Sequence, residues 1–298
     1  MVTGIGLALL AWGAPVARAM LIGEASEDQM VSWASEYLKD HPNDAAAYFC
    51  LGRIHMTAWE SGPGVKLRYA GRAERQLPDF PPMDSVIGPS SDSPATPQAA
   101  PRSKVSTLLD AVAAYRKAVA MDATKARYRL ALAYAYEELA GAAAELPADF
   151  DWGMQEKLND AETADFARAL HEMGSDDVAA RDRASGQMDK LMPRAGPLLS
   201  AYKTSDAEIR GRIAEAISRY WRTQAAELYR EAYAATVADD LRAAQYDDMN
   251  DAMISAEAGE RLLVLFKRDP GAERRGEAAK IAAAVKEEEG KPHMMWEF

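Results

Sequence analysis

Apolar residues recur every three or four positions along most of the chain, the spacing that places them on one face of an α-helix. Alanine, glutamate, leucine and arginine, all strong helix formers, fill the windows after Lys104. No window alternates apolar and polar residues with the β-branched and aromatic content that a strand requires. The pattern therefore predicts an all-α protein. The expected helices span residues 27–40, 44–58, 103–121, 124–141, 151–173, 177–191, 205–235, 246–267 and 273–289.

One long segment interrupts this helical pattern. Seven of the fifteen prolines lie between Pro78 and Pro101, and serine and alanine fill much of the rest of residues 77–103. A segment of this composition buries too little apolar surface to offset the entropy lost on ordering. We therefore expect residues 77–103 to be a flexible insertion, largely disordered from Ser85 to Ser103. A binding lid is the alternative for a loop of this length.

The first residues have the composition of a signal peptide. An apolar run from Gly4 to Val16 is followed by Ala17-Arg18-Ala19, the small-x-small form that signal peptidases accept. Cleavage after residue 19 would leave Met20 as the new terminus and place the protein in the periplasm or outside the cell. Because no Lys or Arg precedes the apolar run, an apolar N-terminal helix of a cytosolic protein remains the alternative. No segment has the ~20 apolar residues that a membrane-spanning helix needs.

The helical part contains an internal repeat. Residues 111–122 read AVAAYRKAVAMD and residues 225–234 read AAELYREAYA, so both place a small, an aromatic and a small residue at the same spacing. Small residues one heptad apart let a partner helix approach closely, while the aromatic side chain fills the groove between the helices. The two closest approaches fall at Ala118 and Ala232. This spacing indicates stacked helix hairpins.

A second pattern accompanies the first. Residues 41–55, HPNDAAAYFCLGRIH, contain an aromatic residue, then Leu51-Gly52, then His55 at the spacing aromatic-x2-Leu-Gly-x2-aromatic. The same spacing recurs from Ala123, with Leu132, Ala133 and Tyr136 in the pattern and Arg129 departing from it.

These segments resemble the tetratricopeptide repeat (TPR) family, over residues 28–56 and 108–141 and more loosely after Ser205. The resemblance implies an α-solenoid of stacked antiparallel helix hairpins, with repeats of about 34 residues. Other α-solenoids and a non-repeat helical bundle are the alternatives. The expected division is a signal peptide at 1–19, N-terminal helices with the first TPR-like helix pair at 20–76, the insertion at 77–103, a TPR-like array at 104–290 and a tail at 291–298.

Composition and motifs narrow the possible chemistry. The formal charge of −11 disfavours nucleic-acid partners, which need clustered Lys and Arg. Cys50 is the single cysteine, so the chain forms no internal disulfide, and we expect it to be buried. The pair His171-Glu172 opens like a zinc-protease helix, but Ser175 occupies the position of the second histidine. We therefore predict no catalytic residue, metal or cofactor.

The resemblance also implies a binding surface. In the TPR family the outward face of each first helix lines a concave groove that binds peptides. Matched to that pattern, the groove of this chain would be lined by Phe49, Arg53, Met56, Arg127, Leu130 and Tyr134.

The sequence accordingly predicts a non-catalytic, exported scaffold that binds a protein or peptide. One alternative is a helical envelope hydrolase with acids from distant helices, such as Glu60, Asp151 or Asp176. The other is a structural subunit of an envelope complex, which would show an exposed apolar patch.

Overall fold

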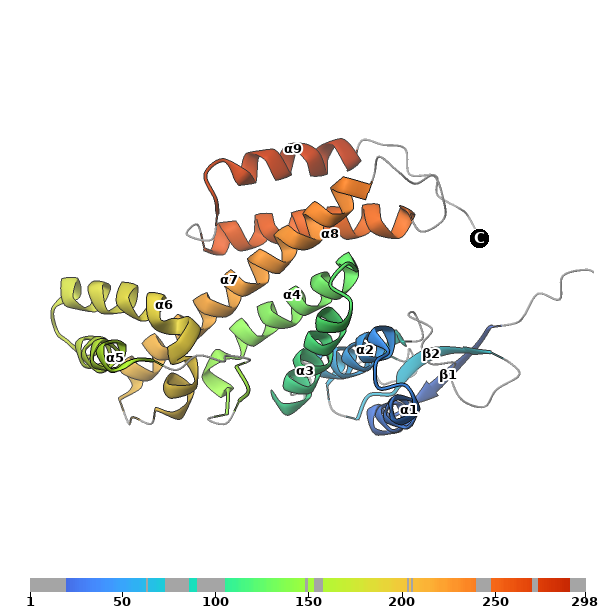
Figure 1. Ribbon diagram of the computed structural model, residues 1–298, viewed down its shortest axis with the longest axis horizontal. Helices are drawn as coiled ribbons and strands as arrows, with labels where there is room; N and C mark the ends of the chain where they lie inside the picture. Colours follow the sequence, from blue (N-terminus) through green and yellow to red (C-terminus); the bar gives the residue numbers. More distant parts are fainter. Residues whose placement is uncertain are drawn as a thin grey trace, which may run out of the picture.

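The structure is a computed structural model that describes residues 20–62, 64–72, 86–89, 105–147, 150–152, 158–202, 204, 206–239, 248–269 and 273–289. The chain is mostly helical, as predicted, and each of the nine expected helices has a counterpart (Figure 1). The helices are α1 (Glu27–Asp40), α2 (Ala45–Ser61), α3 (Val105–Met121), α4 (Ala126–Gly141), α5 (Asp160–Glu172), α6 (Val178–Ala201), α7 (Ala207–Asp239), α8 (Asp248–Arg268) and α9 (Glu277–Glu289), with a 3₁₀ turn at Ala143–Glu145.

Local sequence explains where the first helices begin. Ser26 caps α1 in a reciprocal capping box with Gln29, so that two otherwise unpaired donors are satisfied. Asp44 caps α2, because its carboxylate accepts hydrogen bonds from the backbone N–H groups of Ala46 and Ala47.

Apart from the α5–α6 hairpin, most helices pack against the helix that precedes or follows them in the chain. Helix α2 packs mainly on α3, and α4 mainly on α7, while α8 packs on α7 and α9 on α8. The hairpin α5–α6 is inserted between α4 and α7 and lies against α7 through α6 (Figure 1). The residues between α2 and α3 are likewise an insertion between two packed helices. Both insertions therefore follow the first helix of a packed pair.

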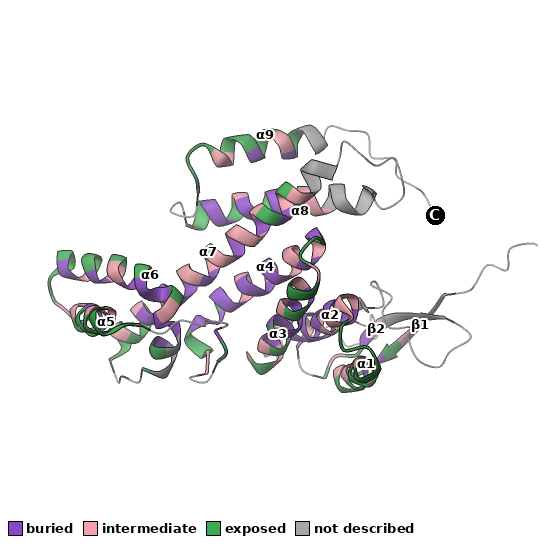
Figure 2. Cartoon of the chain, viewed as in Figure 1, coloured by how far each residue is buried: buried purple, intermediate pink, exposed green. Residues whose placement is uncertain are grey.

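The main core runs along the buried faces of α2, α3, α4 and α7 (Figure 2). Gly52 on α2 is required for this packing, because a Cβ atom at this position would lie 2.4 Å from Cδ1 of the Tyr115 ring. Ala118 and Ala232 are fully buried, as the repeat spacing predicted. Cys50 is also buried, in a smaller cluster beneath α1.

A three-stranded antiparallel sheet shows that the prediction of an all-α fold was incomplete. Strand β2 (Leu67–Arg72) pairs on one side with β1 (Met20–Ala25) and on the other with β3 (Val86–Pro89). Strand β3 lies inside the expected flexible insertion, so that expectation was wrong for these four residues. The strands are short and contain glycines, and their partners lie far apart in sequence, which explains why alternation did not reveal them.

Helices α5 and α6 differ from their expected bounds for reasons of packing. Helix α5 starts at Asp160 instead of Asp151, because Trp152 is buried against Trp221 and Arg116 donates hydrogen bonds to the carbonyls of Asp151 and Trp152. Helix α6 continues past Leu191 to Ala201 and includes two prolines. Gly196 lies directly against Trp152 in that extension, so tertiary contacts override the proline signal.

Three further expectations concern residues that lie outside the described part of the chain. These are the signal peptide, most of the insertion and the tail at 291–298. Among the described helices, none has both the length and the apolar content needed to cross a membrane.

Candidate functional site

Two of the six expected groove residues are core residues. Phe49 is 7% exposed and Met56 4% exposed, and both belong to the main core. The Phe49 ring lies 5.8 Å from the Tyr115 ring and 4.9 Å from the Tyr128 ring, measured between centroids. Because α3 and α4 cover this side of α2, the assignment of Phe49 and Met56 to an open groove was wrong.

The other four expected groove residues are half-buried. Arg53 lies on α2, and Arg127, Leu130 and Tyr134 follow one face of α4. The guanidinium of Arg127 lies over the ring of Tyr128, 5.5 Å from its centroid, and Leu130 packs against the main core. These side chains are therefore partly held by internal contacts.

Tyr134 joins three helices at one point. Its hydroxyl hydrogen-bonds Glu60 on α2, and the guanidinium of Arg261 on α8 lies over its ring, 4.8 Å from the centroid. Burial raises the pKa of Tyr134 well above its ordinary value, and the hydrogen bond and charge of Glu60 raise it further. Tyr134 is therefore a neutral hydrogen-bond donor at neutral pH.

Glu137, one turn further along α4, extends this contact to α7 and α8. Its side chain is 9% exposed and accepts a hydrogen bond of 3.2 Å from the hydroxyl of the fully buried Tyr229. Two arginines of α8 reach the same carboxylate, Arg268 at 3.4 Å and Arg261 at 3.9 Å. A buried carboxylate needs such partners to offset its desolvation.

Trp59 and Glu138 complete the cluster, because the indole Nε1 of Trp59 on α2 donates a hydrogen bond of 3.1 Å to Glu138. We call this cluster the α4 junction. Its members come from four helices, so it fixes how α2, α7 and α8 lie against α4. The α4 junction consists of Trp59, Glu60, Tyr134, Glu137, Glu138, Tyr229, Arg261 and Arg268.

The sequence pointed to Tyr134 as a groove residue and to Glu60 as a possible hydrolase acid, but it indicated neither their contact nor the other members of the α4 junction. Glu137 and Glu138 lie three and four positions after Tyr134, which places all three on one side of α4. That spacing could have indicated from the sequence that the two glutamates lie beside Tyr134. Arg261 and Arg268 gave none, because α8 lies in the part of the chain where the TPR resemblance is loose.

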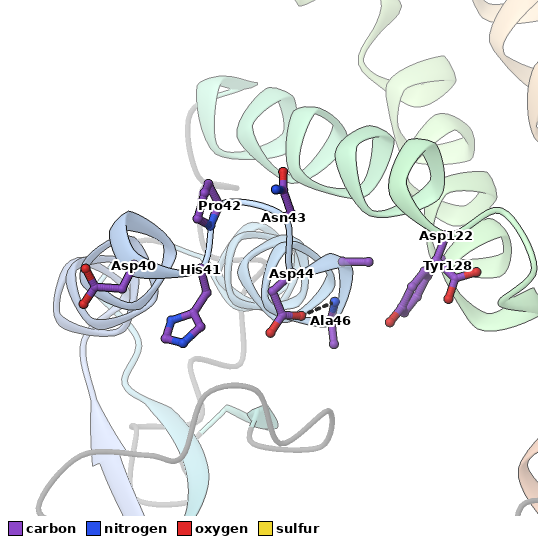
Figure 3. Close-up of a pocket in the computed structure, with 9 residues that line it drawn as sticks. Asp40, His41, Pro42, Asn43, Asp44, Ala46, Asp122 and Tyr128 are labelled. Carbon is purple, nitrogen blue, oxygen red and sulfur yellow. Dashed lines mark hydrogen bonds between the residues drawn. The ribbon is translucent and has the colours of Figure 1, made fainter.

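A separate pocket of 590 Å³ opens where the α1–α2 turn meets the α3–α4 turn (Figure 3). Asp44 and Asp122 lie on its rim, and both carboxylates are engaged in local hydrogen bonds, Asp44 with Tyr37 and the start of α2, and Asp122 with Thr124. Burial raises the pKa of Tyr128, which forms one wall of the pocket, and the negative charges of Asp122 and Asp44 add to this effect. The pocket is thus acidic, but its carboxylates serve to cap turns.

The acids considered for a hydrolase lie on separate elements. Glu60 is on α2, the exposed Asp151 precedes α5, and the exposed Asp176 lies in the turn between α5 and α6, at the opposite side of the molecule from α2 (Figure 1). His55 is buried and contacts Glu27 through Nδ1 at 2.9 Å, so it packs in the interior. Within the described residues, no group of three or more His, Cys, Asp or Glu side chains is placed to hold a metal ion.

The fold and the α4 junction define a mostly helical protein whose helices pack largely in chain order. Comparisons with models of protein families, with curated proteins and with solved structures find no match to this chain.

Proposed function

We propose that the protein is a non-catalytic interaction scaffold that binds a protein or peptide across the face where α2, α4 and α8 meet. The observation that carries this proposal is the set of contacts of Tyr134, which links Glu60 of α2 and Arg261 of α8 across α4. Three helices thereby contribute side chains to one continuous face. The packing of each helix against its neighbours along the chain, with α5–α6 set aside, supports a TPR-like α-solenoid. In such a solenoid the first helices of successive pairs share one face.

The chemistry of this face suits a protein partner. It offers the Tyr134 ring, the half-buried Arg53 and Arg127, and on α8 the partly exposed Val264 beside Arg268. Aromatic residues and arginines contribute most of the binding energy in many protein interfaces, because they combine apolar contact with hydrogen bonding.

The proposal includes export of the protein after cleavage behind residue 19. Strand β1 starts at Met20, so removing residues 1–19 would leave all the described helices and strands complete. The paired β1 strand would then hold the mature N-terminus against β2.

Site-specific crosslinking in the native host tests the binding face. A photo-crosslinking amino acid replaces Thr57, which is half-buried on α2 between Arg53 and Glu60, and in a control variant it replaces the exposed Lys190 of α6. We expect a discrete crosslinked partner from position 57 that is absent from position 190. Crosslinks of equal yield and identity from both positions would exclude this face as the binding surface.

The two alternative functions gain no specific support. The three acids named for a hydrolase lie on separate elements, and no described observation favours a reaction. The exposed large apolar side chains, which would mark a subunit interface, are spread over several helices. We therefore propose only the scaffold function.

A further inference from the structure

The end of α8 and the start of α9 carry an excess of basic residues, although the chain as a whole has a net negative charge. Residues 267–280 contain five basic and three acidic residues, so the sequence there is of mixed charge. In the structure, the acidic and the basic side chains of this segment have different surroundings. The acids are engaged in internal contacts, whereas most of the bases face solvent.

Each acid of this segment has an internal role. Glu277 receives two hydrogen bonds from the guanidinium of Arg230, at 2.7 and 2.8 Å, and its side chain is only 18% exposed. Asp269 lies 3.8 Å from Arg222, and both of these side chains are also 18% exposed. Glu273 accepts a hydrogen bond from the backbone N–H of Ala278 in the first turn of α9.

Most of the bases are not neutralised in this way. Lys267, Arg275 and Lys280 are exposed and form no hydrogen bond or ion pair with any described residue. The side chain of Arg268 is 64% exposed and reaches Glu137 only at 3.4 Å, longer than the 2.7–2.9 Å typical of a charge-assisted bond. Arg274 differs, because it pairs with Glu227 at 2.8 Å. We call Lys267, Arg268, Arg275 and Lys280 the α8–α9 basic patch.

We propose that the α8–α9 basic patch is a docking surface for an acidic segment of a protein partner. The patch adjoins the face proposed above at Arg268, whereas Lys267, Arg275 and Lys280 are not part of that face. Two arginines suit this role, because a guanidinium can hold a carboxylate through two parallel hydrogen bonds. In a chain of net charge −11, the overall field repels an acidic partner, so attraction must come from a local concentration of bases.

An anionic membrane surface fits the patch less well. Helices that bind such surfaces place several large apolar side chains beside their basic residues. The exposed large apolar residues of the described chain include only one on α8 and none on α9, and the residue on α8 is Val264. We therefore favour the acidic protein segment and use vesicles as a test.

The experiment measures binding of a fluorescent polyglutamate peptide to the full chain by anisotropy. The patch variant is R275E/K280E, and the control variant is R183E/K190E on α6, which also reverses one exposed Arg and one exposed Lys. We expect the patch variant to weaken binding by about tenfold or more and the control variant to change it little, because local charges dominate association. Salt should weaken binding by the wild-type chain, since the Debye length falls from about 30 Å at 0.01 M to about 10 Å at 0.1 M.

Three outcomes would overturn the proposal. The first is no binding of polyglutamate by the wild type at about 0.01 M salt, where screening is weakest. The second is an equal loss in the patch and control variants, which would indicate a response to net charge alone. The third is binding to phosphatidylglycerol vesicles without binding to the peptide. The milder variant R275Q/K280Q and a melting curve for each protein separate loss of charge from loss of folding.

Discussion

Single residues decide how closely these helices approach, and glycine positions show this most directly. At Gly52 the approach is so tight that a methyl group would overlap a buried tyrosine ring, whereas at Gly186 on α6 nothing lies within 4 Å of the same position. The TPR resemblance placed Gly52 in its small-residue position. The structure adds the reason, because the Tyr115 ring occupies the space that a side chain would need.

Replacing Gly52 with alanine should therefore destabilise the protein by about 1–3 kcal/mol, the usual cost of overpacking a core. The Tyr115 ring is buried and has little room to retreat. The matched control is Gly186→Ala, which should stabilise the exposed helix by about 0.5–1 kcal/mol. Urea denaturation followed by circular dichroism gives both numbers. Equal effects of the two substitutions would contradict the close approach.

The ion pair of Glu277 with Arg230 predicts a pH dependence of stability. Burial of the Glu277 carboxyl opposes ionisation, but the hydrogen bonds from Arg230 and from the backbone of Arg274 outweigh it and lower the pKa. A carboxyl whose pKa is lower in the folded state stabilises that state above its unfolded pKa, near 4.3, and the contribution is lost as the pH falls through the folded value.

Glu277→Gln should therefore cost about 1–3 kcal/mol at pH 7, because it weakens a pair of charge-assisted hydrogen bonds. The difference between variant and wild type should shrink as the pH falls below about 4. Denaturation at several pH values checks both, with the exposed Glu145→Gln as the control. A difference that stays constant down to pH 2 would mean that the charge of Glu277 is not the cause.

At the scale of elements, pattern predicted helices well and strands poorly. Periodic apolar positions revealed the helices because a helix that buries one face repeats its apolar residues every three or four positions. Helix α4 does so with Leu132, Ala133 and Tyr136. In strand β2, Leu67 is buried in the smaller cluster with residues of α1 and α2, and the strand sequence LRYAGR does not sustain an alternation of apolar and polar residues. The start of α5 was missed because Trp152 and Arg116 hold the chain out of the helix, a contact between segments that periodicity does not report.

The repeat spacing makes a prediction for the contacts between helices. Ala232 of α7 is fully buried, so Ala232→Leu should overpack the interface and cost about 1–3 kcal/mol. Ala234, two residues later on the same helix, is exposed, and Ala234→Leu should change stability by less than about 0.5 kcal/mol. Thermal unfolding of both variants measures the contrast. If the two substitutions are equally mild, the packing of α7 is looser than the structure indicates.

At the scale of the whole molecule, the candidate site was only half predictable. A resemblance between short segments assigns faces by analogy, which put Tyr134, Phe49 and Met56 alike on an open groove. In the structure α3 and α4 cover Phe49 and Met56, whereas Tyr134 is half-buried at a junction of helices. The partners of Tyr134 are Glu60 of α2 and Arg261 of α8, and Arg261 is more than a hundred residues away in sequence. Such contacts follow from the order in which helices pack, and the insertions after α2 and α4 hide that order in the sequence.

The position of strand β1 gives the last prediction. Strand β1 begins at Met20, so a chain consisting of residues 20–298 should melt at the same temperature as the full chain. In the native host, the mature protein should begin at Met20, because the apolar run and Ala17-Arg18-Ala19 precede that residue. Terminal sequencing of the native protein tests this, and the variant A17K/A19K should retain its N-terminal segment. A native protein that still begins at Met1 would show that the apolar run is not removed.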